Sequence, residues 1–216
     1  MPSPLINSPN QAKARLILAH GAGAGANHLV MQKLADALAA QKIEVVRFNF
    51  AYMQRQLTLG RKCFPDKMPL LLECMQQQIQ QTTTDLPLFI GGKSLGGRVA
   101  SLLTELPKQQ GVDNQPKVLA SFAFGYPFHP PKKQVWRTEH FACLQRPLYI
   151  FQGERDPFGT KQELADKAWQ NVSIDWLPDG DHDFKPRKSS GYTQEQLIVL
   201  SAALCREKID EILLAN

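Results

Sequence analysis

The sequence predicts an α/β fold, with a three-layer, doubly wound and mainly parallel sheet of about six strands. Short apolar or β-branched runs alternate with amphipathic segments along the chain, and this order is typical of right-handed βαβ units. Several runs are apolar at nearly every position, as expected for strands that are buried on both faces of a parallel sheet. In such a sheet the functional crevice lies at the carboxyl ends of the strands.

Six short segments rich in aliphatic and aromatic residues are predicted as strands. In chain order they are Arg15–Ala19, Ile43–Phe48, Leu88–Ile90, Val118–Phe122, Leu148–Phe151 and Val172–Trp176.

Helical patterns with start signals lie between these strands. Asn27 is predicted to cap a helix with apolar residues at intervals of four, and the segment from Leu71 to Ile79 repeats that spacing. Capping boxes at Thr160–Glu163 and Thr193–Gln196 predict two later helices.

Size and composition indicate a single domain over residues 1–216. Of the 216 residues, 43% are apolar and 21% are charged, which suits an ordinary globular domain with a full core. The net charge is +5, but the basic residues are interspersed with 20 acidic ones, so no basic face points to a nucleic-acid partner. Nothing in the composition indicates an oligomeric state.

The location and the redox state follow from what the sequence lacks. No apolar run approaches the roughly 20 residues of a membrane span, and the chain does not begin with a basic stretch followed by an apolar one. We therefore expect a cytoplasmic protein without a membrane partner. The four cysteines form no CxxC pair and no zinc-type spacing, so we expect free thiols and no metal. They are Cys63, Cys74, Cys143 and Cys205.

A glycine-flanked serine, Ser94, lies in the turn Gly92-Lys93-Ser94-Leu95-Gly96 between a predicted strand and a helix. A serine at such a turn is held in a strained conformation that projects its hydroxyl above the sheet, while the glycines let strand and helix pass closely. We predict Ser94 as a nucleophile; the alternative is a glycine-rich turn that only packs. A P-loop is excluded because Pro87 stands where that motif requires its first glycine.

A loop of small residues, Gly21–Ala26, follows the first predicted strand. It satisfies the dinucleotide-binding pattern G-x-G-x-x-A, but a dinucleotide site also needs an acid at the end of the second strand. That strand ends in Phe48-Asn49-Phe50. In a hydrolase the free amides of such a loop, with the amide that follows the nucleophile, stabilise an oxyanion.

The predicted oxyanion donors are therefore Ala22 or Gly23 from this loop, together with Leu95. His20, immediately before the loop, is expected to shape it.

Candidates for a base and an orienting acid follow two later strands. The order Ser94, Asp156, His182 places all three at carboxyl ends of strands, on one rim of the sheet. We predict His182 as general base and then acid, and Asp156 as the residue that fixes its tautomer. Glu154 is an alternative to Asp156, whereas the acids on either side of His182 are expected to point away from it.

The surroundings of this rim predict an open pocket with no large cap domain. The connection from Gly125 to Arg146 is too short for a cap, and the pocket walls are expected at residues 126–131 and 52–65. Tyr126 and Phe128 are the predicted substrate-binding residues. Basic rim residues suggest an anionic acyl or leaving group, against the commoner interpretation of a solvated charged surface. They are Arg98, Lys132, Lys133, Arg137, Lys185, Arg187 and Lys188.

Four segments together resemble the small α/β-hydrolases related to dienelactone hydrolase: LILAHGAGAG, GGKSLGGR, GERDPFG and DGDHDF. The resemblance is to the hydrolase-like family with testis-expressed and chromatin-complex members, and it extends from about Arg15 to the last helix. It implies the α/β-hydrolase fold with Ser94, Asp156 and His182 as a triad. Dienelactone hydrolases use cysteine where this chain has Ser94, so their lactone hydrolysis is not carried over.

These observations predict a serine hydrolase that cleaves small carboxylic esters or thioesters through an acyl-enzyme. Its expected partner is a small-molecule acyl substrate, and it requires no cofactor. Two alternatives remain open. One is a non-catalytic α/β-hydrolase-like protein that binds a ligand or another protein in the same crevice, and the weaker one is a peptidase.

Overall fold

Seven strands form one sheet in the order β1-β3-β2-β4-β5-β6-β7. The computed structural model describes residues 3–81, 84–104, 116–133 and 135–215. The strands are β1 (Leu5–Asn7), β2 (Ala14–Ala19), β3 (Ile43–Phe48), β4 (Leu88–Lys93), β5 (Val118–Phe124), β6 (Leu148–Gly153) and β7 (Val172–Leu177). β1 pairs antiparallel with β3, and all other pairs are parallel.

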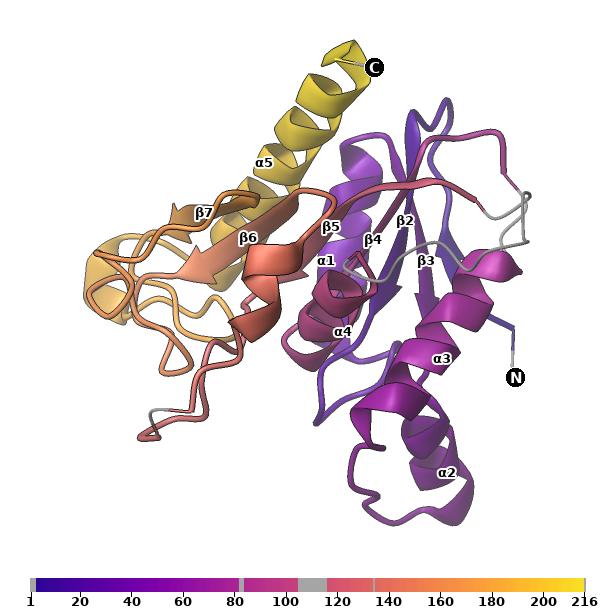
Figure 1. Ribbon diagram of the computed structural model, residues 1–216, viewed down its shortest axis with the longest axis horizontal. Coiled ribbons are helices and arrows are strands. Elements are labelled where there is room, and N and C mark those ends of the chain that lie inside the picture. Colours follow the sequence, from indigo (N-terminus) through magenta and orange to yellow (C-terminus); the bar gives the residue numbers. More distant parts are fainter. Residues whose placement is uncertain (1–2, 82–83, 105–115, 134, 216) are drawn as a thin grey trace.

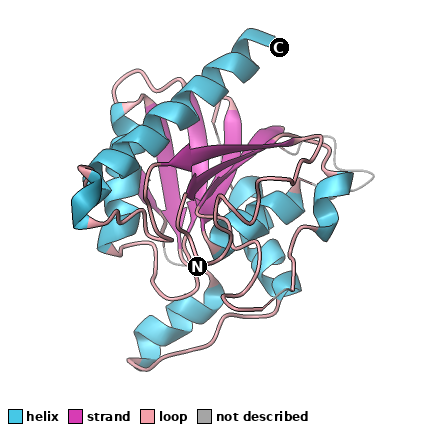
Figure 2. Cartoon of the chain, turned by 90° about the vertical axis from the view of Figure 1, so that its left-hand side faces the viewer, coloured by secondary structure: helices cyan, strands magenta, loops and turns pink. Residues whose placement is uncertain are grey.

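Helices cover both faces of this sheet (Figures 1 and 2). They are α1 (Leu29–Ala40), α2 (Ala51–Leu59), α3 (Met68–Gln80), α4 (Leu95–Leu103) and α5 (Gln194–Ala215), with short 3-10 turns η1 (Glu139–Cys143) and η2 (Lys188–Ser190). α1 packs beside α5, and α3 beside α4. The predicted three-layer, doubly wound architecture is confirmed.

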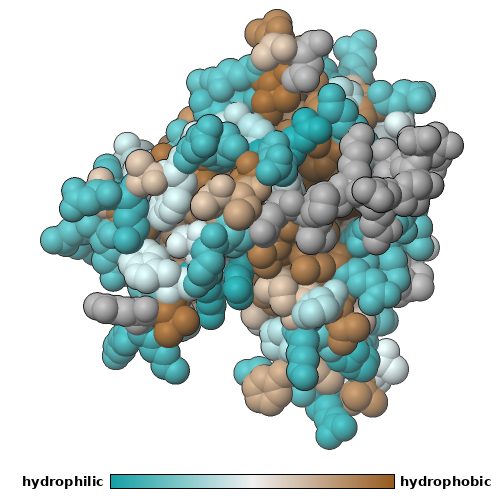
Figure 3. All heavy atoms as spheres, viewed as in Figure 1, coloured by the Kyte–Doolittle hydropathy of each residue, from teal (hydrophilic) through white to brown (hydrophobic). Residues whose placement is uncertain are grey.

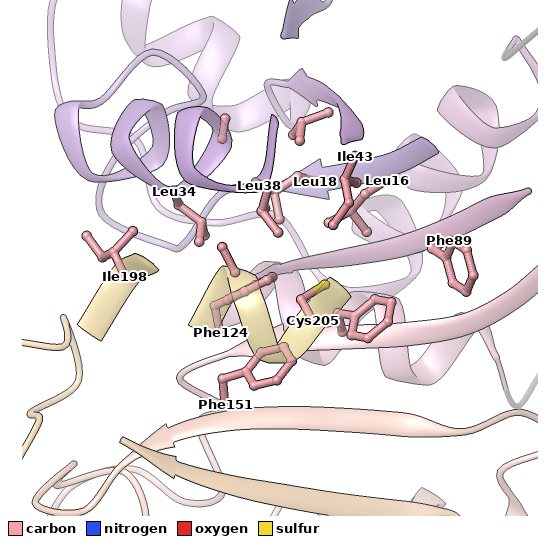
Figure 4. Close-up of a cluster of buried hydrophobic side chains, with 14 of the residues drawn as sticks. Leu16, Leu18, Leu34, Leu38, Ile43, Phe89, Phe124, Phe151, Ile198 and Cys205 are labelled. Atoms are coloured by element: carbon pink, nitrogen blue, oxygen red, sulfur yellow. The ribbon is translucent and has the colours of Figure 1, made fainter. Parts of the chain in front are cut away.

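Alternating residues of the strands belong to two separate hydrophobic cores, one on each face of the sheet. In β2, Leu16 and Leu18 point to the side of α1 and α5, where they join Phe124 and Phe151 in one buried cluster (Figure 4). Ile17, between them, belongs to the cluster on the side of α3 and α4. Because neighbouring side chains of a strand point to opposite faces, a strand buried on both sides must be apolar throughout.

The six predicted strands are all present, and β1 is a seventh that was not predicted. It has three residues, its side chains are exposed or half-exposed, and it lies at the edge of the sheet. Such a segment carries no apolar pattern of its own.

Two predictions about helix starts need correction. α1 is capped by His28, whose Nδ1 accepts a hydrogen bond from the N–H of Val30 at 3.4 Å, and not by Asn27. The capping box at Thr160–Glu163 forms, with the N–H of Thr160 donating to the Glu163 carboxylate at 2.8 Å, but residues 161–166 are turns and not a helix.

Residues 161–166 do not form a helix because the segment has too few apolar residues. A surface helix needs an apolar stripe along several turns, and Leu164 is the one buried hydrophobic residue of residues 161–168. These turns and β7 line a hollow of about 430 Å³, and its walls include Trp169 and Trp176. The second capping box, at Thr193–Gln196, does begin a helix, α5.

The four cysteines are free thiols, as predicted. Within the described ranges, none of the helices combines the length and apolar character that crossing a membrane requires.

Candidate active site

Ser94 lies in a strained turn between β4 and α4. Its φ of 51° and ψ of −112° lie outside the regions that side-chain-bearing residues ordinarily adopt. The turn is tight because strand and helix touch: a Cβ at Gly92 would lie 2.4 Å from the carbonyl carbon of Gly96. The N–H of Ser94 donates to the carbonyl of Phe124 on β5 at 3.2 Å. The hydroxyl is thereby held at the carboxyl end of the sheet.

Ser94, His182 and Asp156 form one chain of hydrogen bonds. The Ser94 Oγ lies 2.8 Å from His182 Nε2, and His182 Nδ1 lies 2.7 Å from Asp156 Oδ2. Because a carboxylate only accepts, the imidazole proton is on Nδ1 and Nε2 is free to accept the serine proton. The structure thus brings together the three residues that the sequence singled out. Asp156 is fully buried, whereas the His182 side chain is 20% exposed.

The alternative acids have other partners. Glu154 binds Lys161 at 2.7 Å and accepts the N–H of Asp179 at 3.0 Å, contacts that lower its pKa. Asp181 accepts the N–H groups of Asp183 and Lys185 within its own turn. Asp156 is therefore the carboxylate that orients His182.

The loop after β2 is fixed by two buried side chains. His20 Nε2 accepts the N–H of Phe50 at 3.1 Å, so Nδ1 carries the proton and donates to the carbonyl of Gly21 at 2.7 Å. Burial lowers the pKa of His20 to about 4, which keeps the ring neutral. The hydroxyl of Tyr52 lies 3.1 Å from the Gly21 carbonyl and 3.2 Å from that of Ala22. His20 shapes the loop, as expected, and Tyr52 is a second support that was not predicted.

The predicted oxyanion donors belong to the start of α4 and to the loop after β2. Leu95 is the first residue of α4, so its N–H has no carbonyl one turn earlier to bond with. A Cβ at Gly21 would lie 3.7 Å from the Cβ of Ser94, so this loop packs directly against the turn that carries Ser94. Ala22 and Gly23 are exposed, and their N–H groups donate no hydrogen bond within the part of the chain that the structure describes. Both remain predicted donors.

Lys93, whose sequence context suggested only a P-loop pattern, contacts the residue that pairs with Ser94. Its ammonium donates to the main-chain carbonyl of His182 at 2.6 Å and lies 3.5 Å from the Asp183 carboxylate. Burial lowers its pKa, while the charges of Asp183 and Asp156 oppose that shift.

Gln152 is a second unpredicted residue. It is fully buried, and its side-chain nitrogen donates to Asp156 Oδ2 at 2.9 Å while its oxygen accepts the N–H of Tyr126 at 2.7 Å. A signal for it was available, because it is a polar residue directly after the apolar run of a predicted strand and four positions before Asp156.

Tyr126 and Phe128 do not line an open pocket, which corrects their predicted role in substrate binding. Both side chains are fully buried in a cluster that includes Phe141. The hydroxyl of Tyr126 donates to the carbonyl of Arg137 at 2.9 Å, and burial raises its pKa. Large aromatic rings so placed stabilise the connection between β5 and β6 from within.

The basic residues that were predicted for the rim differ in how they are paired and buried. Arg187 pairs with Asp179, whereas the lysines of the rim are exposed. Arg98 and Arg137 are half-buried; burial, and then the charge of Arg98, lower the pKa of Arg137. Figure 3 shows the surface hollowed between the lobe of α2 and α3 and the part that carries β6 and β7.

Comparisons with known proteins agree on the fold. Residues 12–210 match a protein family described as alpha/beta hydrolase domain. The chain is similar to an alpha-beta serine hydrolase homologue from Coxiella burnetii, with 16% identity, a TM-score of 0.65, and coverage of 95% of this chain and 90% of that one. Among curated proteins no sequence matches it significantly.

Two further structural neighbours are enzymes by name. Dienelactone hydrolase from Anabaena variabilis shares 16% identity at a TM-score of 0.65, with 94% of this chain and 88% of that chain covered. Est1E from Butyrivibrio proteoclasticus, with ferulic acid bound, shares 11% identity at a TM-score of 0.66, with 96% and 95% covered. The predicted resemblance to small α/β-hydrolases related to dienelactone hydrolase is confirmed, and at these identities the structures establish the fold alone.

Proposed function

This chain belongs to the alpha/beta hydrolase domain family, and on that premise we propose that it is a serine hydrolase of small carboxylic esters or thioesters. The observation that supports the proposal most strongly is the unbroken chain of hydrogen bonds from Asp156 through His182 to Ser94. A serine hydroxyl is a weak nucleophile unless a positioned base removes its proton. Here the base, its orienting acid and a strained serine occur together.

The reaction follows from this geometry. Ser94 Oγ bonds to the acyl carbon as its proton passes to His182 Nε2, and Asp156 stabilises the imidazolium that forms. The N–H of Leu95, with that of Ala22 or Gly23, binds the oxyanion. The tetrahedral intermediate then expels the alcohol or thiol, which takes the proton from His182. Water, activated by the same imidazole, releases the acid and restores the serine.

The substrate class and location are proposed on related grounds. The names of two structural neighbours, dienelactone hydrolase and Est1E with bound ferulic acid, make ester bonds the first class to test. We propose a small acyl molecule as the partner of the site, without nucleic acid or membrane. Four free thiols suit the reducing cytoplasm, which is the proposed location.

Labelling with a fluorophosphonate probe tests this function. The wild-type protein is expected to form one covalent adduct that maps to Ser94, and S94A is expected to remain unlabelled while folded. Hydrolysis of a small activated ester is expected to fall by about 10⁴-fold or more in S94A. S173A, which changes an exposed serine near the amino end of β7, is the matched control and is expected to label normally. A folded wild-type protein that does not label would favour a non-catalytic binding protein.

A further inference from the structure

Lys93 carries a buried charge directly before the nucleophile, and the reaction described above makes no use of it. The residue is only 7% exposed and is the last residue of β4. Lysine is almost never buried to this extent unless its charge is paired, because leaving water costs an ammonium several kcal/mol. The groups that offset this cost identify the part of the chain to which Lys93 is bound.

Three consecutive residues of the loop after β7 surround the ammonium. It donates to the carbonyl of His182 at 2.6 Å, lies 3.5 Å from the Asp183 carboxylate, and is 5.9 Å from the ring centroid of Phe184. The hydrogen bond to His182 joins residues 89 positions apart in the chain. It therefore ties the histidine's main chain to the strand that ends at the nucleophile.

The space around the ammonium is shared with the imidazole. A Cβ at Gly125, which has a φ of 73°, would lie 3.0 Å from the His182 carbonyl oxygen, 3.2 Å from Lys93 Nζ and 3.5 Å from His182 Nδ1. Lys93 also touches the loop after β2, since a Cβ at Gly21 would lie 3.5 Å from the Lys93 carbonyl oxygen and 3.9 Å from the Lys93 Cγ. Lys93 thus lies between two loops. One follows β2 and carries the predicted oxyanion donors, and the other follows β7 and carries His182; we call the second the histidine loop.

Other contacts of the histidine loop do not make the same connection. Asp181 accepts N–H groups of Asp183 and Lys185, which shapes the turn internally. The N–H of Arg155 donates to the carbonyl of Gly180 at 2.9 Å, which anchors the start of the loop to the β6 side. The contact to β4 near the imidazole comes from Lys93.

We propose that Lys93 is a positioning residue whose ammonium holds the main chain of His182 so that Nε2 faces Ser94. This inference rests on the proposed serine-hydrolase function. The ammonium also lies 3.5 Å from the Asp183 carboxylate, so Lys93 contacts two consecutive residues of the loop that carries the imidazole. Removing the ammonium therefore releases this loop from the end of β4.

The variant K93M tests the inference, because methionine fills a similar space without a donor or a charge. With kcat normalised to the serines that a fluorophosphonate titrates, K93M is expected to lose about 10- to 100-fold in kcat, since small misplacements of a catalytic group have that effect. KM for a neutral ester is expected to change by less than about twofold, because Lys93 positions the base and does not bind the substrate.

D183N and K161M complete the experiment. D183N leaves the hydrogen bond from Lys93 to the His182 carbonyl in place, so it is expected to keep kcat within about threefold. K161M removes an exposed lysine paired with Glu154 and is expected to leave kcat and KM unchanged.

The outcomes distinguish the serine-hydrolase function from the positioning role of Lys93. A wild-type protein that neither labels nor hydrolyses esters would refute the serine-hydrolase function. A labelled wild-type protein with a K93M variant of normal kcat would overturn the role of Lys93. If K93M does not fold, K93Q takes its place, because its shorter side chain keeps a polar group in the site but reaches less far toward the His182 carbonyl; a normal kcat in K93Q would equally overturn the role of Lys93.

Discussion

The carboxylate of Asp156 is buried and charged at once, and its hydrogen bonds explain how. Its Oδ1 accepts the N–H of Phe158 at 2.8 Å, and its Oδ2 faces both His182 and the side-chain amide of Gln152. A buried carboxylate is stable only when donors replace the water that it lost. Gln152 is the side-chain amide among these donors, so its loss would leave the buried carboxylate with one hydrogen bond fewer.

The isosteric variant Q152E is expected to lower the free energy of unfolding by about 2–4 kcal/mol near neutral pH. It replaces a donor 2.9 Å from Asp156 with a second carboxyl, and two carboxyls so close cannot both ionise. The introduced carboxyl has a raised pKa in the folded state, so the loss of stability is expected to grow as pH rises from 5 to 8. Urea denaturation at both pH values measures it.

Q145E provides the control for Q152E. Gln145 is exposed and donates to the carbonyl of Cys143, so the same change of charge there is expected to alter stability by less than about 0.5 kcal/mol. A Q152E protein as stable as wild type at pH 8 would show that Gln152 does not support the buried carboxylate.

The residues of the site differ in how well sequence predicts them. Ser94, Asp156 and His182 were predictable because each follows a strand whose apolar pattern is visible, and their order along the chain is informative. Lys93 acts on a carbonyl 89 residues away, so its role depends on a contact that no local pattern contains. Gln152 carries a local signal, being four residues before Asp156, but its amide is also held by Tyr126, 26 residues away. Hydrogen-bond partners of this kind become visible only in the folded chain.

At the level of the elements, β4 and α4 approach each other and β2 more closely than side chains permit. A Cβ at Gly96 would lie 2.4 Å from the main-chain oxygen of Ala19 and 2.9 Å from its Cβ. Because the first of these atoms belongs to the backbone of a central strand, no rotamer change can relieve the clash. The position of α4, and with it the height of Ser94 above the sheet, depends on this contact.

G96A is therefore expected to lower the free energy of unfolding by about 3 kcal/mol or more, because the added methyl group must displace α4 from β2. G23A is the matched control for stability, since a Cβ at Gly23 would meet no atom within 4 Å. Thermal unfolding of the two variants measures the contrast. Equal midpoints would mean that α4 can shift at little cost.

Errors in predicting the elements follow from weak apolar patterns. α2 was expected only as a pocket wall, since the buried hydrophobic residues of this helix are Tyr52 and Met53 at its first turn. Residues 161–166 carry a helix start signal without an apolar stripe and remain turns. In contrast α5, which has both, begins at the predicted capping box. A local start signal is thus insufficient where tertiary packing does not support the helix.

For the whole molecule, two buried histidines link the folding equilibrium to pH. His20 packs against Phe50 and Tyr52, and His140 packs against Phe141. Burial lowers the pKa of each to about 4, and in His140 the charge of Arg98 contributes further. Both rings are therefore neutral in the folded protein at a pH where the unfolded chain already binds protons.

The free energy of unfolding is expected to be nearly constant between about pH 7 and 8 and to fall between about pH 6.5 and 4. In that window the unfolded state binds more protons than the native state, so acid favours unfolding. Each unit of pKa difference corresponds to about 1.4 kcal/mol, and with two histidines the expected loss is several kcal/mol. Urea denaturation at half-unit intervals from pH 8 to 4 measures this curve.

The variant H140Q separates the histidine contribution from that of the carboxylates. Glutamine can still donate to the Ser101 hydroxyl, which lies 2.8 Å from His140 Nε2, but it does not titrate. The slope between pH 6.5 and 4 is therefore expected to fall by about half. Glu44, Glu154 and Glu163 have lowered pKa values, so the stability they contribute is lost as pH falls below their unfolded pKa, near the lower end of this window. If H140Q retained the full slope from pH 6.5 to 5, the acid sensitivity would have to arise from groups other than His140.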